Sequence, residues 1–212
     1  MKKIVIGVTV IVMILSIACA ESITLHNGVQ FCMTKDEVKQ LEKYASPVRG
    51  TVMKVETEYL GGIPGGSISY YFNEEKLMKC EYQFGETSKH VDLKQTYTTK
   101  YGTPFATNTP IKEVTGIAGS TSDALKKYHA FVDDYTFYYG SYLWSKVELN
   151  GIYQWFVPTD DGGIVEIVLV CYERTGTHSY SINEAYYFYR TPEESQAIYD
   201  VINQKDASYN DI

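Results

Sequence analysis

Apolar and polar residues alternate along several segments of the chain, and this period of two is typical of strands in a half-exposed antiparallel sheet. In the segment 51–60 the alternation places Met53, Val55 and Tyr59 on one face, and in 76–84 it places Leu77 on the outward face. The alternation and the turn residues between segments predict seven strands, at 51–60, 67–73, 76–84, 143–149, 152–157, 164–172 and 181–189.

Capping signals and a helical period predict four helices. Thr34 with Glu37 forms a capping box at the start of the first helix. The second, at 90–101, carries apolar residues at steps of four and stops at Gly102. A third is expected at 122–135, and Thr191-Pro192-Glu193-Glu194 opens the last with a cap, a proline and an acidic first turn.

Together these elements predict an α+β fold in which capped helices pack on an antiparallel sheet. The strand at 164–172 is apolar on both faces except for Glu166, which indicates a central position. We expect one domain over residues 21–212, with 103–121 as the place for an internal division. The order of helix, strands and helix occurs twice, which suggests two similar helix-plus-sheet halves.

The N-terminus has the parts of an export signal. Lys2 and Lys3 precede an apolar stretch of fourteen residues, and Ala18-Cys19-Ala20 supplies small residues for a peptidase. The stretch is shorter than the roughly 20 residues of a membrane span, so we expect residues 1–20 to be removed and the domain to be secreted or associated with the cell envelope. The alternative is lipidation of Cys19, which would tether the domain to a membrane.

The charge of the mature chain argues against nucleic acid as a partner. Removal of Lys2 and Lys3 from 19 basic side chains leaves all 26 acidic ones, for a net charge of −9, whereas nucleic-acid affinity depends on Lys and Arg. The four histidines are isolated and no phosphate-binding loop is present. We therefore expect no metal and no cofactor.

Three cysteines follow the signal: Cys32, Cys80 and Cys171. An odd number leaves at least one thiol unpaired, and the sequence does not say which two could pair. The simplest expectation is three buried thiols that act as small hydrophobic residues. Cys32 directly precedes a helix, where a thiol pKa can fall, so a cysteine nucleophile is the catalytic alternative.

Aromatic content is the unusual feature of the composition. The chain has twenty tyrosines, thirteen of them between Tyr128 and Tyr209. Most are expected to cap sheet faces with their hydroxyls in water. Tyr187 and Tyr189 share a strand face, and Trp144 lies outward if its neighbours face the core, so these three predict an exposed binding patch.

Two short motifs resemble those of a known group of proteins. The run from Asn27 to Val38, N-G-V-Q-F-C-M-T-K-D-E-V, is similar to the F-G-M-T-x-x-E-V opening of small bacterial envelope proteins with a β-lactamase-inhibitor-protein-like fold. Lys100-Tyr101-Gly102-Thr103-Pro104 is similar to their K-Y-G-x-P helix ending. The resemblance implies an α+β fold and binding of a partner protein through a sheet face. Cys32 stands where the motif has Gly, and no functional residue carries over.

The leading hypothesis is an exported, non-catalytic binding module that contacts another envelope or secreted protein through an aromatic-rich sheet face. The alternatives are an extracellular or cell-wall hydrolase that uses Cys32 or scattered carboxylates, and a glycan-binding module, because exposed Trp and Tyr also stack on sugars.

Overall fold

The structure is a computed structural model that describes residues 23–43, 45–46, 50–85, 89–107, 137–139, 142–176 and 180–210. Its helices are η1 (His26–Gly28, a 3₁₀ turn), α1 (Lys35–Leu41), α2 (His90–Tyr101) and α4 (Pro192–Asn210). Its strands are β1 (Val52–Glu56), β2 (Tyr59–Leu60), β3 (Ile63–Pro64), β4 (Gly66–Asn73), β5 (Lys76–Phe84), β6 (Ala106–Thr107), β7 (Phe137–Tyr139), β8 (Tyr142–Pro158), β9 (Ile164–Gly176) and β10 (Tyr180–Arg190). The predicted α+β class is confirmed.

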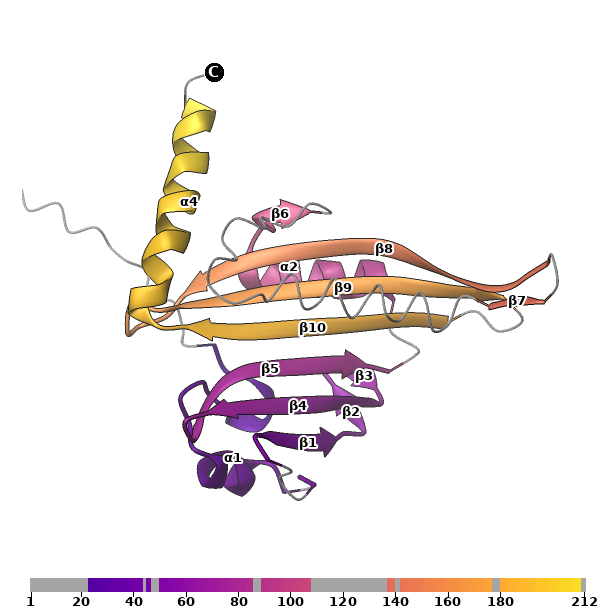
Figure 1. Cartoon of the computed structure of the whole chain (residues 1–212), viewed down its shortest axis with the longest axis horizontal. Helices are drawn as coiled ribbons and strands as arrows, with labels where there is room; N and C mark the ends of the chain where they lie inside the picture. The colour runs from indigo at the N-terminus through magenta and orange to yellow at the C-terminus, as the bar shows by residue number, and fades with distance from the viewer. Residues whose placement is uncertain are drawn as a thin grey trace, which may run out of the picture.

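One antiparallel sheet dominates the described part of the chain (Figure 1). Its eight strands run in the order β1-β4-β5-β10-β9-β8-β6, with β7 paired to β8, and β2 and β3 form a separate hairpin. The pairing of β5 with β10 joins the N-terminal strands to the C-terminal ones. β9 lies between β10 and β8, and residues 164–172 are buried on both faces, so the predicted central strand is confirmed.

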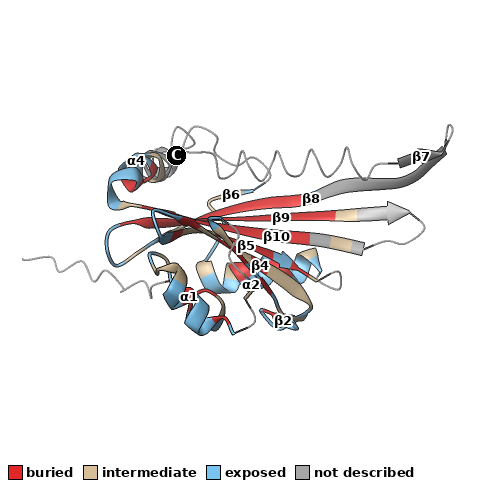
Figure 2. Ribbon diagram, turned by 60° about the horizontal axis from the view of Figure 1, so that its bottom comes forward, coloured by how far each residue is buried: buried red, intermediate tan, exposed pale blue. Residues whose placement is uncertain are grey.

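The main core lies between one face of this sheet and the elements that cover it. α1 and α2 lie on the same side of the sheet (Figure 2). Val38 from α1 and Leu93 from α2 pack in the same cluster as buried residues of the sheet. The segment before α1 is part of this core too, because Ile23 and Leu25 are buried in the same cluster. Apolar burial of this kind supplies most of the stabilising free energy of a fold.

The caps of the first two helices follow the sequence prediction. The Thr34 side chain accepts the backbone N–H of Glu37, and the Glu37 carboxylate accepts the backbone N–H of Thr34 at 2.7 Å. This pair of bonds satisfies two donors that a helix start otherwise leaves without partners. Gly102 ends α2 with a φ of 82°, a conformation that favours glycine. The helix expected at 122–135 lies outside the described residues, as does most of the 103–121 linker.

Three strand predictions are corrected by the structure. The segments 143–149 and 152–157 form one strand, β8, which continues through a register shift between Leu149 and Gly151. Tyr59 is 61% exposed, because the chain leaves β1 after Glu56 and turns into the β2–β3 hairpin. Leu77 is buried, because a register shift between β4 and β5 moves it to the inward face.

The last helix packs at the end of β10. Thr191 and Glu194 bond reciprocally at its start, the backbone N–H of Thr191 donating to the Glu194 carboxylate at 3.0 Å. Ile198 is buried against Ile164 of β9. Among the described residues, no helix has the length and apolar character needed to cross a membrane.

Candidate functional site

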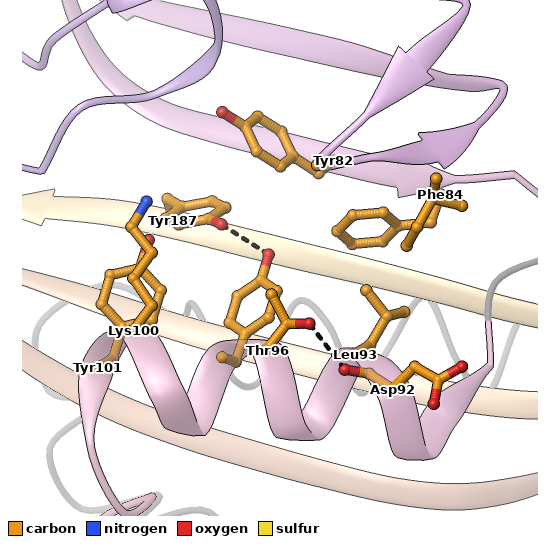
Figure 3. A pocket seen from close by; sticks show the side chains of 11 residues that line it. Tyr82, Phe84, Asp92, Leu93, Thr96, Lys100, Tyr101 and Tyr187 are labelled. Carbon is orange, nitrogen blue, oxygen red and sulfur yellow. Dashed lines mark hydrogen bonds between the residues drawn. The ribbon is translucent and has the colours of Figure 1, made fainter.

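An open pocket with mostly apolar walls, which include five aromatic side chains, lies between α2 and strands β5 and β10 (Figure 3). Its volume is about 220 Å³. We call it the aromatic pocket, and its described lining residues are Gly61, Ile63, Tyr82, Phe84, Asp92, Leu93, Thr96, Tyr97, Lys100, Tyr101 and Tyr187. Three separate elements and the β2–β3 turn therefore build one site.

The local sequence explains why these side chains meet. Leu93, Tyr97 and Tyr101 recur at steps of four, so they share the face of α2 that is turned toward the sheet. Tyr82 and Tyr187 are inward residues of paired strands. Their rings lie 5.0 Å apart between centroids, which is a normal spacing for a favourable aromatic pair.

The floor of the aromatic pocket is uncharged. The hydroxyls of Tyr97 and Tyr187 are hydrogen-bonded to each other at 2.6 Å. Burial raises the pKa of both phenols, so both remain protonated at neutral pH. Trp155 lies behind Tyr97, with 5.6 Å between ring centroids, and its indole N–H donates to the Gly102 carbonyl. Such a floor offers apolar contact and one bonded hydroxyl pair, and no general base.

Polar groups lie at the mouth of the aromatic pocket, on the exposed side of α2. Asp92, Thr96 and Lys100 follow one another at steps of four along the helix, and all three are exposed. The Thr96 hydroxyl donates to the backbone carbonyl of Asp92 at 2.8 Å. The site therefore combines an apolar interior with a mouth that carries one acidic side chain, Asp92, and one basic side chain, Lys100.

Two of the three residues of the predicted exposed patch, Tyr187 and Tyr189, are buried. Tyr187 is 4% exposed and Tyr189 is 7% exposed, because their face of β10 is the one that the N-terminal segment and α2 cover. Tyr187 lines the aromatic pocket, whereas Tyr189 stacks on Phe31 in a different cavity. Trp144 lies in β8, but its side chain is outside the described residues.

The residues of α2 that complete the aromatic pocket were not predicted as site residues. Their step-of-four spacing was visible in the sequence, but it predicted a helix and said nothing about which strand the helix would cover. The contribution of Tyr82 depends on the pairing of β5 with β10, which joins segments about a hundred residues apart.

Cys32 lies in a second, shallower cavity of about 180 Å³ that Phe31, Asp161 and Tyr189 also line. The expectation of a buried thiol is wrong here: Cys32 is exposed, with a φ of 65° at the turn before α1. The Tyr189 hydroxyl donates to Asp161, and hydrogen bonds from Thr159 and then from Tyr189 hold the pKa of Asp161 below its ordinary value. The described residues that line this cavity include no histidine to activate the thiol.

The other two thiols agree with the sequence expectation. Cys80 and Cys171 are buried, and burial raises the pKa of both. No disulfide joins any two of these three described cysteines. A thiol whose pKa is raised stays protonated and reacts slowly.

A buried carboxylate that sequence analysis missed lies at the end of α1. Glu42 is 2% exposed and accepts hydrogen bonds from His26 Nδ1 at 2.9 Å, Asn27 Nδ2 at 3.0 Å and the Tyr70 hydroxyl at 2.6 Å. A cavity of about 660 Å³ lies beside it. These hydrogen bonds connect the end of α1 to η1 through His26 and Asn27 and to β4 through Tyr70, so Glu42 has a structural role.

No group of three or more His, Cys, Asp or Glu side chains in the described part of the chain is arranged to hold a metal ion. Comparison with known proteins found no matching family model, no matching curated protein and no matching solved structure.

Proposed function

We propose that this chain is an exported, non-catalytic binding module, and that it holds a partner protein at the aromatic pocket. The observation that carries the proposal is the convergence of five aromatic side chains from three elements on one open cavity, Tyr82, Phe84, Tyr97, Tyr101 and Tyr187. Aromatic residues dominate the energetically important centres of protein interfaces. The proposed contact is thus a pocket beside a helix, in place of a flat sheet face.

The size and the apolar lining of the aromatic pocket favour an apolar side chain of a protein over a drug-sized small molecule. Its volume of about 220 Å³ is below the roughly 300–1,000 Å³ of small-molecule sites. It has room for one large apolar side chain, which is how an interface anchor is normally held. Asp92 and Lys100 at the mouth can make polar contacts around such an anchor.

The resemblance to β-lactamase-inhibitor-protein-like envelope proteins is kept as part of this proposal. Three local features support it: the capping box at Thr34, the left-handed conformation of Cys32 where the motif has Gly, and the helix stop at Gly102. The idea of two similar halves is supported by α2 following β5 and α4 following β10.

The test uses a side chain that closes the mouth of the aromatic pocket. Thr96→Trp places an indole over the opening, whereas Thr99→Trp places one on an exposed position of α2 that does not line the pocket. The protein and both variants serve as bait against envelope and culture-supernatant fractions, with mass spectrometry as the readout. Circular dichroism shows whether both variants keep the fold.

A protein captured by the unchanged chain and by Thr99→Trp, and lost with Thr96→Trp, is the expected result. Equal capture by both variants would remove the aromatic pocket from the proposal. The absence of any specifically captured protein would overturn the protein-binding function itself.

A further inference from the structure

A polar crevice lies on the face of the sheet opposite to α2, and the aromatic pocket does not extend to it. Its volume is about 250 Å³. Its described lining residues come from four neighbouring strands: Lys54 of β1, Ser67, Ser69 and Tyr71 of β4, Glu81, Tyr82 and Gln83 of β5, and Glu184 of β10. Among these described residues, Tyr82 is the one that also lines the aromatic pocket.

The crevice follows from the strand alternation. The inward residues of β4 are buried in the core, so the residues between them face the other side of the sheet. Two of these are serines, and Ser69 stands in register between Lys54 on one side and Glu81 on the other. Small side chains on β4 between long ones on its neighbours leave a trough along the strand.

Two carboxylates of the crevice are held in fixed positions. The Glu81 carboxylate accepts the Tyr71 hydroxyl at 2.7 Å and the Lys79 ammonium at 2.9 Å. Glu184 accepts the hydroxyls of both Tyr172 and Tyr186 on the same oxygen, Oε2. Its Oε1 makes none of these bonds, which leaves an oriented acceptor at the crevice wall. Groups that are already oriented bind a ligand with a smaller loss of entropy.

The balance of charge and hydrogen-bonding groups identifies the class of ligand. Glu81 is neutralised by Lys79, and the lining charges of Lys54 and Glu184 are opposite, so the crevice favours neither an anion nor a cation. Lys54 and the Gln83 amide supply donors beside the Glu184 acceptor, and the Ser67 hydroxyl donates to Gln83 Oε1 at 3.4 Å. The backbones of β4 and β5 are already paired on both sides, so an added peptide strand has no edge to join.

We propose that the polar crevice binds a neutral saccharide, one sugar ring at a time. A ring carries neighbouring hydroxyls that both donate and accept, so one hydroxyl donates to Glu184 Oε1 and others accept from Lys54 Nζ and Gln83 Nε2. The volume of about 250 Å³ is below the roughly 300–1,000 Å³ of drug-sized ligand sites, so the crevice has room for one ring and not for a longer buried chain.

The test is a titration of the ¹⁵N-labelled protein with glucose, galactose and N-acetylglucosamine, followed by amide chemical shifts. At least one sugar is expected to shift amides in β4, β5 and β10 around the crevice. Gln83→Ala removes one donor and is expected to weaken binding about 5–10-fold. Ser69→Leu fills the trough and is expected to abolish binding. The matched control is Gln95→Ala, on an exposed position of α2 outside the crevice.

Failure of all three sugars to shift any amide would overturn the proposal. Shifts located only at the aromatic pocket, or shifts that persist unchanged in Gln83→Ala and Ser69→Leu, would do the same. Thr96→Trp leaves the crevice intact, so it is expected to bind the sugar as the unchanged protein does. The result for the crevice is therefore independent of the proposed protein partner.

Discussion

Many of the described tyrosine hydroxyls form hydrogen bonds with other side chains. The sequence had suggested instead that most tyrosine hydroxyls would be exposed to solvent. Five of the described tyrosines donate to carboxylates: Tyr70 to Glu42, Tyr71 to Glu81, Tyr172 and Tyr186 to Glu184, and Tyr189 to Asp161. A buried hydroxyl needs a partner, and a carboxylate accepts a strong hydrogen bond. The tyrosines thus join the sheet faces to acidic residues at defined positions.

The hydroxyl pair in the floor of the aromatic pocket gives a first prediction. Tyr97→Phe or Tyr187→Phe alone leaves the other hydroxyl buried without its partner, which should lower the free energy of unfolding by about 1–3 kcal/mol. The double variant removes both hydroxyls, so we expect it to cost less than the sum of the single changes. Urea unfolding of the four proteins measures this, and an additive result would contradict the paired role.

His90 gives a prediction about pH. Its Nε2 lies 2.6 Å from the Tyr153 hydroxyl, and burial, followed by repulsion from Lys94, holds the pKa of His90 below its ordinary value of 6.5. The unfolded chain therefore binds a proton at a pH where the folded ring does not. The His90 contribution to the free energy of unfolding is complete above pH 6.5 and decreases as the pH falls toward the lowered folded pKa.

Urea unfolding at a series of pH values below neutrality tests the role of His90. In His90→Gln, which cannot titrate, the decrease in stability over this range should be smaller than in the unchanged protein. An identical pH dependence in the two proteins would show that His90 keeps its ordinary pKa.

At the scale of elements, the end of β5 is packed directly against the β2–β3 hairpin. A Cβ atom at Gly85 would lie 2.1 Å from the Pro64 carbonyl oxygen, so the backbone itself would have to move. This contact places the hairpin beside the end of β5 and thereby sets the position of Gly61 and Ile63 in the lining of the aromatic pocket.

We predict that Gly85→Ala lowers the free energy of unfolding by about 3 kcal/mol, near the upper end of overpacking costs. Gly102→Ala is the comparison, because its φ is 82° but nothing lies within 4 Å of the added Cβ. Strain at the Gly102 φ of 82° and ψ of −169°, a region almost exclusive to glycine, should cost about 1–3 kcal/mol. Urea unfolding compares them, and an equal or smaller loss for Gly85→Ala would show that the hairpin adjusts easily.

Local patterns explain which elements were predictable from the sequence. Alternation in β4 and the capping residues of α1 depend on neighbours in the chain, so both were predicted correctly. β8 was predicted as two strands separated at Asn150-Gly151, a pair of residues that also favours hairpin turns, yet here the chain makes a register shift inside one strand. Gly151 suits that position because a Cβ there would lie 2.6 Å from the Tyr153 hydroxyl.

The candidate site was less predictable, since it depends on which segments meet in space. The sequence correctly placed Tyr187 and Tyr189 on one face of a strand, but it did not indicate which face of that strand the helices would cover. The polar face of β4 was also visible in the alternation. Its crevice needs Glu184 from β10, a strand whose pairing with β5 no local pattern indicates.

At the scale of the whole molecule, the pairing of β5 with β10 makes the sheet continuous. One buried thiol lies in the strands on each side of this pairing, so labelling of the two thiols can follow the unfolding of the two parts separately. Cys80 lies in β5 and Cys171 lies in β9. If the sheet unfolds as one cooperative unit, both thiols should become reactive at the same urea concentration.

Iodoacetamide labelling followed by peptide mass spectrometry tests this prediction. Cys32 should be labelled in the folded protein, because it is exposed, and it serves as the internal control for reagent activity. Labelling of Cys80 at a clearly lower urea concentration than Cys171 would indicate two halves that unfold separately.

The burial of Ile23 would limit the movement of the domain if Cys19 carried a lipid. Cys19 precedes Ile23 by only four residues, which span at most about 14 Å when fully extended. A lipid on Cys19 would therefore hold the domain against the bilayer through a linker that is too short for the domain to rotate freely relative to the membrane. The same end of the molecule would always face the lipid headgroups, and only partners within reach of that membrane could meet the remaining surfaces.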